Sequence, residues 1–145
     1  DSYQLLFTSR LYEFLYHLCR SYSHQIPSAS LTGSQRDLQR VTHVMNWVKV
    51  HYPEPLSLET AADSLALSKE YFCRLFKKYT GQTFLEYLND VRTMHLYEDL
   101  QNSDETITVL MEKNGLSNYK IFMRTFKKLY GSTPQKMRSN RIRHV

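Results

Sequence analysis

The octapeptide RLFKKYTG at residues 74–81 occurs again, in closely similar form, as RTFKKLYG at residues 124–131. The residues upstream also correspond, because LETAADSLALS (58–68) aligns with ITVLMEKNGLS (107–117) and the second copy has one residue more before its basic segment. Each copy contains a short apolar segment, a turn and a longer basic segment. This order predicts a duplicated helix-turn-helix.

Both basic segments are predicted to be amphipathic helices, because their apolar residues recur at intervals of three and four. The inward side chains are predicted to be Phe72, Leu75, Phe76 and Tyr79 in the first copy and Phe122, Phe126 and Leu129 in the second. The outward side chains are then Glu70, Cys73, Arg74 and Lys77, followed by Lys120, Met123, Arg124 and Lys127. A glycine follows each segment, where a left-handed residue commonly ends a helix.

The remaining segments also favour helices, and no stretch alternates apolar and polar residues for long enough to predict a sheet. We therefore expect an all-α fold of two helix-turn-helix subdomains joined by a long central helix, preceded by a linker and an N-terminal helix. Thr83, with Glu86 three residues later, predicts a capping box at the start of the central helix. The predicted ranges are an N-terminal helix at 1–24, a serine-rich linker at 25–35 and a helical domain at 36–145. Within this domain the first helix covers 36–50, the helix-turn-helix units cover 57–80 and 105–130, and the central helix covers 83–101.

The basic residues are concentrated in the part of the chain that contains the duplication. Residues 66–145 hold fourteen lysines and arginines against eight acidic residues, whereas residues 1–65 hold five against six. Such a concentration is typical of a domain that binds a polyanion. An amphipathic helix with outward donors also suits the major groove, where arginines reach base edges and lysines reach phosphates. Double-stranded DNA is therefore the predicted partner.

Two other classes of function are compatible with this pattern. A helical protein-interaction module would also contain amphipathic helices with solvated lysines, and an enzyme of the DNA-repair type would use Cys73 as a nucleophile. The sequence predicts no catalytic residue, because no base partner is fixed beside Cys73 and the six histidines are scattered. It predicts no metal site and no cofactor either.

The composition bears on location and on chain boundaries. No apolar run approaches the roughly 18 residues of a membrane-spanning helix, so no membrane partner is expected. Only two cysteines occur, in no CxxC arrangement, which favours a reducing, cytoplasmic setting over a disulfide framework. The sequence begins with DSYQLL rather than with a methionine, and we expect it to be a fragment of a longer protein.

The segment LSLETAADSLALSKEYFCRLFKKYTGQTFLEYLNDVR, followed by GLSNYKIFMRTFKKLYGSTPQKMR, resembles the DNA-binding domain of the AraC/XylS (arabinose-regulator-like) bacterial transcription factors. The resemblance covers roughly residues 36–140 and implies that the domain at 36–145 is a DNA-binding domain. It implies a bacterial transcription regulator, often an activator, whose two helices enter successive major-groove segments of a promoter. It also implies a preceding effector-binding and dimerisation domain, and residues 1–24 resemble the helical end of such a domain. A homodimer formed through that domain and the 1–24 helix is implied as well, with RNA polymerase as a further partner.

The resemblance also implies which residues contact DNA. The base-reading positions fall on Glu70, Cys73, Arg74, Tyr119, Lys120, Met123 and Arg124. The phosphate-contacting positions fall on Ser68, Lys69, Lys77, Lys78, Asn118, Lys127 and Lys128. Arginine chemistry agrees with the assignment, because a guanidinium can donate to O6 and N7 of guanine together.

The chain departs from the family's pattern at four positions. Ala66 stands where the turn of the first unit usually has glycine, which implies either a turn without a positive φ or mild strain. Met111 replaces a small alanine, while Asn114 and Asp99 replace aliphatic residues. A bulky or polar side chain at an inward position is expected to disturb the packing of the second unit.

Overall fold

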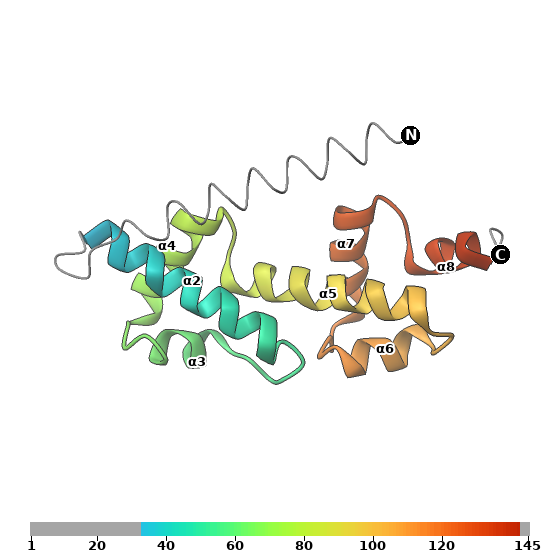
Figure 1. Cartoon of the computed structure of the whole chain (residues 1–145), viewed down its shortest axis with the longest axis horizontal. Helices are drawn as coiled ribbons and strands as arrows, with labels where there is room; N and C mark the ends of the chain where they lie inside the picture. The colour runs from blue at the N-terminus through green and yellow to red at the C-terminus, as the bar shows by residue number, and fades with distance from the viewer. Residues whose placement is uncertain (1–32, 143–145) are drawn as a thin grey trace, which may run out of the picture. The chain divides into compact units, whose positions relative to one another are not determined.

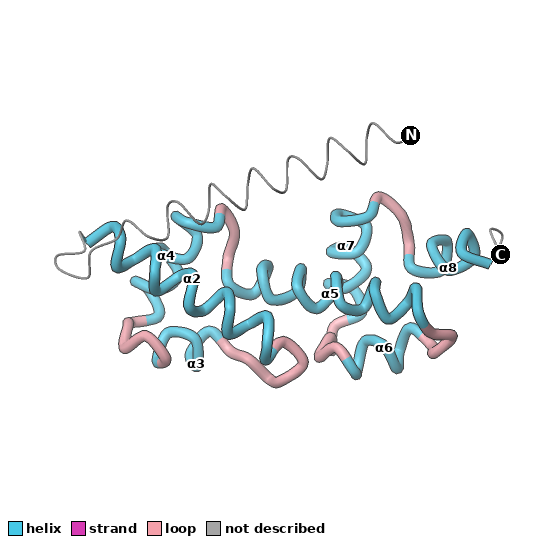
Figure 2. Tube along the Cα trace, viewed as in Figure 1, coloured by secondary structure: helices cyan, strands magenta, loops and turns pink. Residues whose placement is uncertain are grey.

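The computed structural model describes residues 33–142, with side chains up to Ser139. The predicted helix at 1–24 and most of the predicted linker lie outside the described residues. Within the described range all regular structure is helical (Figure 2), which confirms the predicted all-α fold. The helices are α2 (Gly33–His51), α3 (Leu58–Asp63), α4 (Lys69–Thr80), α5 (Phe84–Asn102), α6 (Ile107–Lys113), α7 (Tyr119–Tyr130) and α8 (Pro134–Ile142).

Helix α5 is the central element of the domain, and a helix-turn-helix lies at each of its ends (Figure 1). In this view α4 and α7 stand on one side of α5, while α3 and α6 lie on the other side. We call α2, α3, α4 and the first half of α5 the first unit, and the second half of α5 with α6, α7 and α8 the second unit. The predicted duplication is thus present as two helix-turn-helix units joined by one helix.

Capping interactions explain why the helices begin and end where they do. The predicted box at the start of α5 is confirmed, since the Glu86 carboxylate accepts from the Thr83 backbone N–H at 2.8 Å and Thr83 Oγ1 accepts from the Glu86 N–H at 3.3 Å. Gly81 ends α4 at φ 77° and Gly131 ends α7 at φ 68°, as the glycine pattern predicts. Helix α2 begins at Gly33, three residues before the expected start at Arg36.

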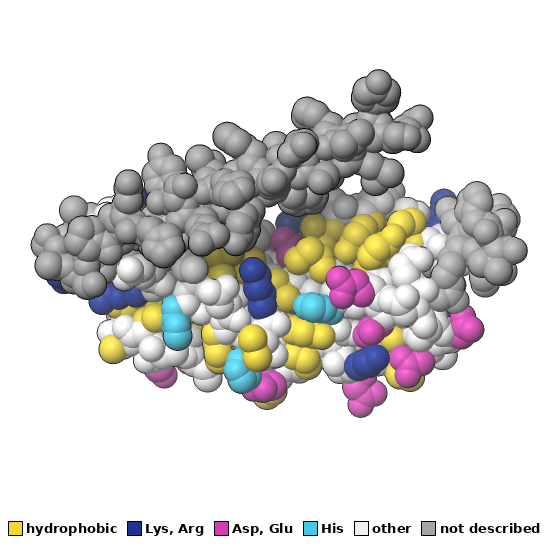
Figure 3. Space-filling view, viewed as in Figure 1, with side chains coloured by type: hydrophobic (Ala, Val, Ile, Leu, Met, Phe, Trp, Pro, Cys, Tyr) yellow, Lys and Arg dark blue, Asp and Glu magenta, His cyan; other side chains and the backbone are white. Residues whose placement is uncertain are grey.

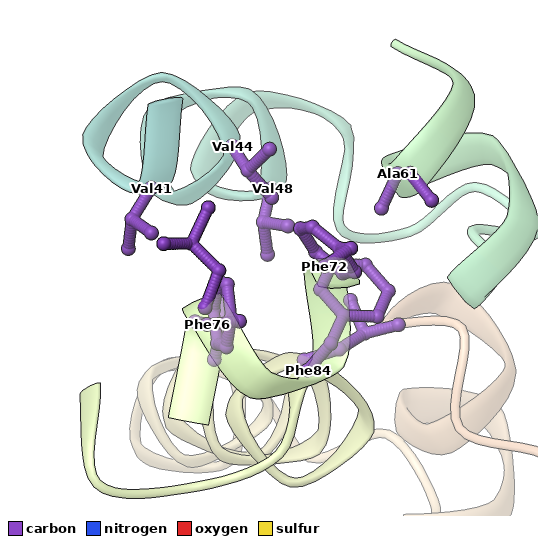
Figure 4. Packing of buried hydrophobic residues seen from close by; sticks show 11 residues of the cluster. Val41, Val44, Val48, Ala61, Phe72, Phe76 and Phe84 are labelled. Atoms are coloured by element: carbon purple, nitrogen blue, oxygen red, sulfur yellow. The ribbon is translucent and has the colours of Figure 1, made fainter. Parts of the chain in front are cut away.

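The first core lies between α2, α3, α4 and α5 (Figure 4). Aromatic rings form its centre: Phe76 packs edge-on against Phe84 and Tyr87, with ring centroids 5.8 Å and 5.6 Å apart. Trp47 lies at the edge of this core and is half-buried. The buried residues are Val41, Val44, Val48, Ala61, Ala62, Phe72, Leu75, Phe76, Phe84, Leu88 and Val91.

The second core belongs to the second unit and shares no residue with the first. Phe126 is fully buried in it and packs edge-on against Phe122, with centroids 5.7 Å apart. The buried residues are Leu96, Leu100, Leu110, Met111, Leu116, Phe122 and Phe126. Met111, whose bulk was expected to disturb this core, is only 6% exposed and packs within it. Each unit therefore has its own hydrophobic centre.

The turn of the first unit shows that Ala66 adopts a left-handed conformation. Its φ is 53°, and among the described residues other than glycine no second residue has a positive φ. Gly115 occupies the same place in the second unit at φ 72°, and both turns repeat one hydrogen-bond pattern: Leu67 N–H donates to Ala62 O, and Leu116 N–H donates to Met111 O. The sequence implies either a turn without a positive φ or mild strain at Ala66, and the positive φ supports strain.

Replacing Ala66 by glycine should stabilise the first unit by about 0.5–1 kcal/mol. Relief of the left-handed strain contributes about 1–2 kcal/mol, and the greater freedom of glycine in the unfolded chain offsets about 0.4–1 kcal/mol of it. Urea unfolding followed by the fluorescence of Trp47 measures the change. Ser64→Gly is the matched control, because Ser64 is exposed in the same turn at φ −58° and should lose stability. A destabilised Ala66→Gly variant would show that the turn is not strained.

The two polar residues at inward positions of the second unit bind one another. The Asn114 side-chain amide donates to Asp99 Oδ2 at 2.9 Å and to Leu110 O at 2.9 Å. Asn114 is 1% exposed, so these acceptors compensate for the loss of its contacts with water. The expected disturbance of packing is therefore absent here, because the departures at positions 99 and 114 complement each other.

A double-mutant cycle should reveal this pairing. Asp99→Leu leaves the buried amide without one acceptor and should cost about 1–3 kcal/mol. Asn114→Val should cost less, because Asp99 is partly exposed and also lies 3.4 Å from Lys113 Nζ. The double variant should then be more stable than the sum of the single losses predicts, by at least about 0.5 kcal/mol. Additive losses in chemical unfolding would mean that the two side chains contribute independently.

Candidate nucleic-acid interface

Helix α4 presents one apolar and one polar face, as its spacing predicts. Phe72, Leu75 and Phe76 are buried, whereas the three predicted base-reading residues of this helix are exposed. The predicted phosphate-contacting residues Lys77 and Lys78 are also exposed, one turn further along. Ser68 caps the helix by accepting from the Tyr71 N–H at 3.3 Å. The exposed face of α4 therefore carries Glu70, Cys73, Arg74, Lys77 and Lys78 together.

Helix α7 repeats this arrangement with one difference. Tyr119, which is 53% exposed, lies with Lys120 and Arg124 on the outer surface, and Lys127 and Lys128 are exposed near the end of the helix. Met123 is only half-buried and packs against the second core, so part of the side chain is used for packing. Asn118 caps the helix, since its Oδ1 accepts from the Ile121 N–H at 3.0 Å.

The lysines of the two copies differ in their neighbours. Lys128 Nζ lies 3.1 Å from the Asp90 carboxylate of α5, whereas Lys78 Nζ lies 5.3 Å from the centre of the Tyr79 ring. Lys69 Nζ lies 2.7 Å from the Glu59 carboxylate. The hydrogen bond with Glu59 raises the pKa of Lys69 and lowers that of Glu59. Two of the predicted phosphate contacts are thus already paired with carboxylates.

A cleft of about 340 Å³ lies between α5 and α7. Glu86 and Asp90 lie on its α5 wall, and Arg124 and Lys128 on its α7 wall. Hydrogen bonds from Thr83 lower the pKa of Glu86, and the charges of Lys128 and Lys77 lower it further. Glu86 and Asp90 are not among the DNA-contacting residues predicted from the sequence. Position 90 lies 38 residues before Lys128, and no spacing pattern indicates such a contact.

Among the described residues no group of three histidine, cysteine or acidic side chains could hold a metal ion. Cys73 is exposed and not part of a disulfide. Of the helices in residues 33–142, none combines the length and the apolar character needed to cross a membrane. On the face drawn in Figure 3 several acidic side chains lie over the half of the domain that contains α6, and Glu98, Glu105 and Glu112 are exposed.

Comparisons with known proteins agree with this geometry. A family model described as a helix-turn-helix domain matches residues 61–140. The HTH-type transcriptional activator RhaS of Escherichia fergusonii is 31% identical over 111 residues, which are 77% of this chain and 40% of that protein. An uncharacterized HTH-type transcriptional regulator of Staphylococcus aureus is 33% identical over 102 residues, which are 70% of this chain and 14% of that protein. The chain thus spans less than half the length of these relatives.

Solved structures are similar over most of their own length. The DNA-binding domain of AdpA, in complex with a target DNA, has a TM-score of 0.63 and 25% identity, covering 70% of this chain and 91% of that one. A protein of unknown function from Listeria innocua has a TM-score of 0.63 and 30% identity, covering 68% and 94%. The family model matches more than half of the chain and coincides with the duplicated unit. The chain therefore belongs to the AraC-type family of helix-turn-helix domains.

Proposed function

We propose that this chain is a sequence-specific DNA-binding transcription regulator whose helices α4 and α7 read successive major-groove segments of a bacterial promoter. The observation that carries this proposal is the matching placement of Arg74 and Arg124. Each is exposed at the sixth residue of its helix, opposite a buried phenylalanine face, and both helices stand on one side of α5 (Figure 1). A duplex lying along that side would meet both arginines.

The spacing supplied by α5 supports two-segment binding. The helix has 19 residues and is about 28 Å long at 1.5 Å per residue. Major-groove segments on one side of a duplex recur about every 34 Å. The similar AdpA domain was solved in complex with a target DNA, which supports duplex DNA as the ligand of this chain. The predicted site residues remain the proposed contacts, with Met123 the member whose packing leaves least surface for a base.

The longer protein is proposed to regulate transcription, as the names of its relatives indicate, and the family resemblance supplies the rest of the proposal. Regulation by a small effector bound in a preceding domain, dimerisation through that domain and residues 1–24, contact with RNA polymerase and a cytoplasmic location are all parts of this proposal. A regulator of this kind binds DNA without altering it. An enzyme that uses Cys73 would instead modify its substrate, and a protein-interaction module would not retard DNA, so one binding experiment separates the three functions.

The binding experiment is a titration of the chain with duplex DNA at several salt concentrations. We expect binding without any small ligand and a loss of affinity of about 10³-fold or more between 50 and 200 mM salt, as six or more phosphate contacts would give. Replacing Lys78 by glutamine should flatten the salt slope by about one unit. Replacing Lys128 should flatten it less, because Asp90 already neutralises that lysine. Affinity that does not change with salt would contradict phosphate binding by these lysines.

A further inference from the structure

The two units touch on the side of α5 that lies away from α4 and α7, at the loop that joins α2 to α3. We propose that Arg92 is a positioning residue: it holds this loop against the turn of the second unit and thereby fixes the distance between the two DNA-reading helices. The proposal rests on the proposed function for its consequence in DNA binding, but the structural part can be tested without DNA.

Arg92 lies in α5 just after the last residue of the first core, and its side chain crosses to the α2–α3 loop. Its Nε donates to Tyr52 O at 2.7 Å and its Nη2 donates to Glu54 O at 2.6 Å. Arg92 is half-buried as a whole residue. Two short bonds from a planar, permanently charged group to two carbonyls of one loop fix the position of that loop relative to α5.

A second contact fastens the same loop to α5. The rings of Tyr52 and His95 are stacked, with centroids 4.0 Å apart and planes 5° apart. His95 lies one turn after Arg92, so the two side chains hold the loop from adjacent positions of one helix. The loop therefore moves with α5 rather than independently.

The second unit meets this loop at Gly115. A Cβ built on Gly115 would lie 2.6 Å from Pro53 O and 3.1 Å from Arg92 Nε, so a larger residue would require the backbone to shift. Gly115 is the turn residue between α6 and α7, three residues before the cap of α7. A displacement of the Pro53 carbonyl would thus be passed directly to the helix that carries Arg124.

Beside the contact between Gly115 and Pro53 the two units are not packed against each other. A groove of about 880 Å³ opens beside it, with Pro53 and Leu56 on one wall and Met111, Leu116 and Tyr119 on the other. In the groove the two units are separated by open space rather than by packed side chains. The brace, defined as Tyr52–Glu54, Arg92 and Gly115, supports the two units beside this groove, and the ion pair between Lys128 and Asp90 is a separate contact between them.

The structural test measures the distance between α4 and α7 in the whole chain. Spin labels are placed on Cys73 and on a cysteine introduced by Lys120→Cys, with Cys19 replaced by serine. Arg92→Lys preserves the charge, but one ammonium cannot occupy the positions of both Nε and Nη2. We expect a wider distance distribution in Arg92→Lys, a displaced one in Gly115→Ala, and an unchanged one in Met94→Ala, an exposed control on the same helix.

The functional test uses duplexes selected by the parent chain, with one base pair inserted or removed between the two segments. One base pair displaces a segment by about 3.4 Å along the helix axis, and we expect the parent to disfavour altered spacing about tenfold. In Arg92→Lys this discrimination should fall to about threefold or less, while affinity for a duplex with a single segment stays within about twofold.

The outcomes are distinguishable. Unchanged distances in both variants, or undiminished discrimination of spacing, would overturn the role of Arg92 even if DNA binding is confirmed. If the parent chain binds no duplex, the proposed function fails, while the label distances still decide whether the brace exists. If Arg92→Lys does not fold, as far-ultraviolet circular dichroism would show, Gly115→Ala decides the question alone.

Discussion

Replacing Phe126 by alanine is expected to destabilise the second unit by about 3–5 kcal/mol, the usual cost of removing a fully buried phenylalanine side chain. Phe126 is 0% exposed, and its ring lies 4.8 Å from that of Tyr130 and 5.7 Å from that of Phe122. Three aromatic contacts, the third with Tyr97 at 6.1 Å, would be lost together. The cavity would lie between α5 and α7, which the chain cannot close without moving the helix that carries Arg124.

Because the two cores share no residue, this loss should be confined to one half of the domain. Trp47 is the single tryptophan of the chain and packs against the first core. In urea, the variant should lose part of its helical circular dichroism before the fluorescence of Trp47 changes. Leu85→Ala, at an exposed position of α5, is the control and should leave both transitions in place. Coincident and equally shifted transitions would mean that the units unfold as one.

The second large effect concerns DNA specificity. Arg74→Ala should relax base preference in one segment of the binding site and Arg124→Ala in the other, each at a cost of about 1–3 kcal/mol if the arginine contacts a guanine through two bonds. The physical reason is that Arg74 and Arg124 are exposed on different helices, which stand apart from each other on one side of α5 (Figure 1). Selection of binding sites from random duplexes by the parent and by both variants measures the effect.

Lys78→Gln is the control for this selection, since a phosphate contact should weaken all sequences alike without changing the preferred bases. Loss of preference at the same bases in both arginine variants would refute separate reading by the two helices. A change of preference caused by Lys128→Gln but not by Arg124→Ala would refute the assignment within α7. The comparison of Lys128→Gln with Arg124→Ala is informative because Lys128 and Arg124 line the same cleft as Asp90.

The sequence predicts the fold well because its strongest signals are local. Apolar spacing in α4 and α7 depends on one helix at a time, and it correctly places Phe72, Phe76, Phe122 and Phe126 inward. The terminal glycines and the Thr83–Glu86 box likewise act within a few residues. Such signals can be recognised in the sequence without knowledge of the tertiary structure.

The contacts that join distant segments could not be predicted in this way. Asp99 and Asn114, taken separately, indicate two packing faults, yet together they form one hydrogen bond across 15 positions. Asp90 beside Lys128 and Arg92 beside Tyr52 are 38 and 40 positions apart. Their partners are set by the crossing of α5 with its neighbours, and single-residue patterns do not encode that geometry.

The separation of the two cores along the chain has a consequence for synthesis on the ribosome. Every residue of the first core lies at or before Val91, and every residue of the second lies at or after Leu96. Adding the roughly 35 residues from Val91 to Phe126 takes about 2–7 s at 5–20 residues per second. Helical units with local contacts fold in microseconds to milliseconds. The amino-terminal half can thus complete its core while the carboxy-terminal half is still being translated, and the nascent second half emerges beside a partner that is already folded.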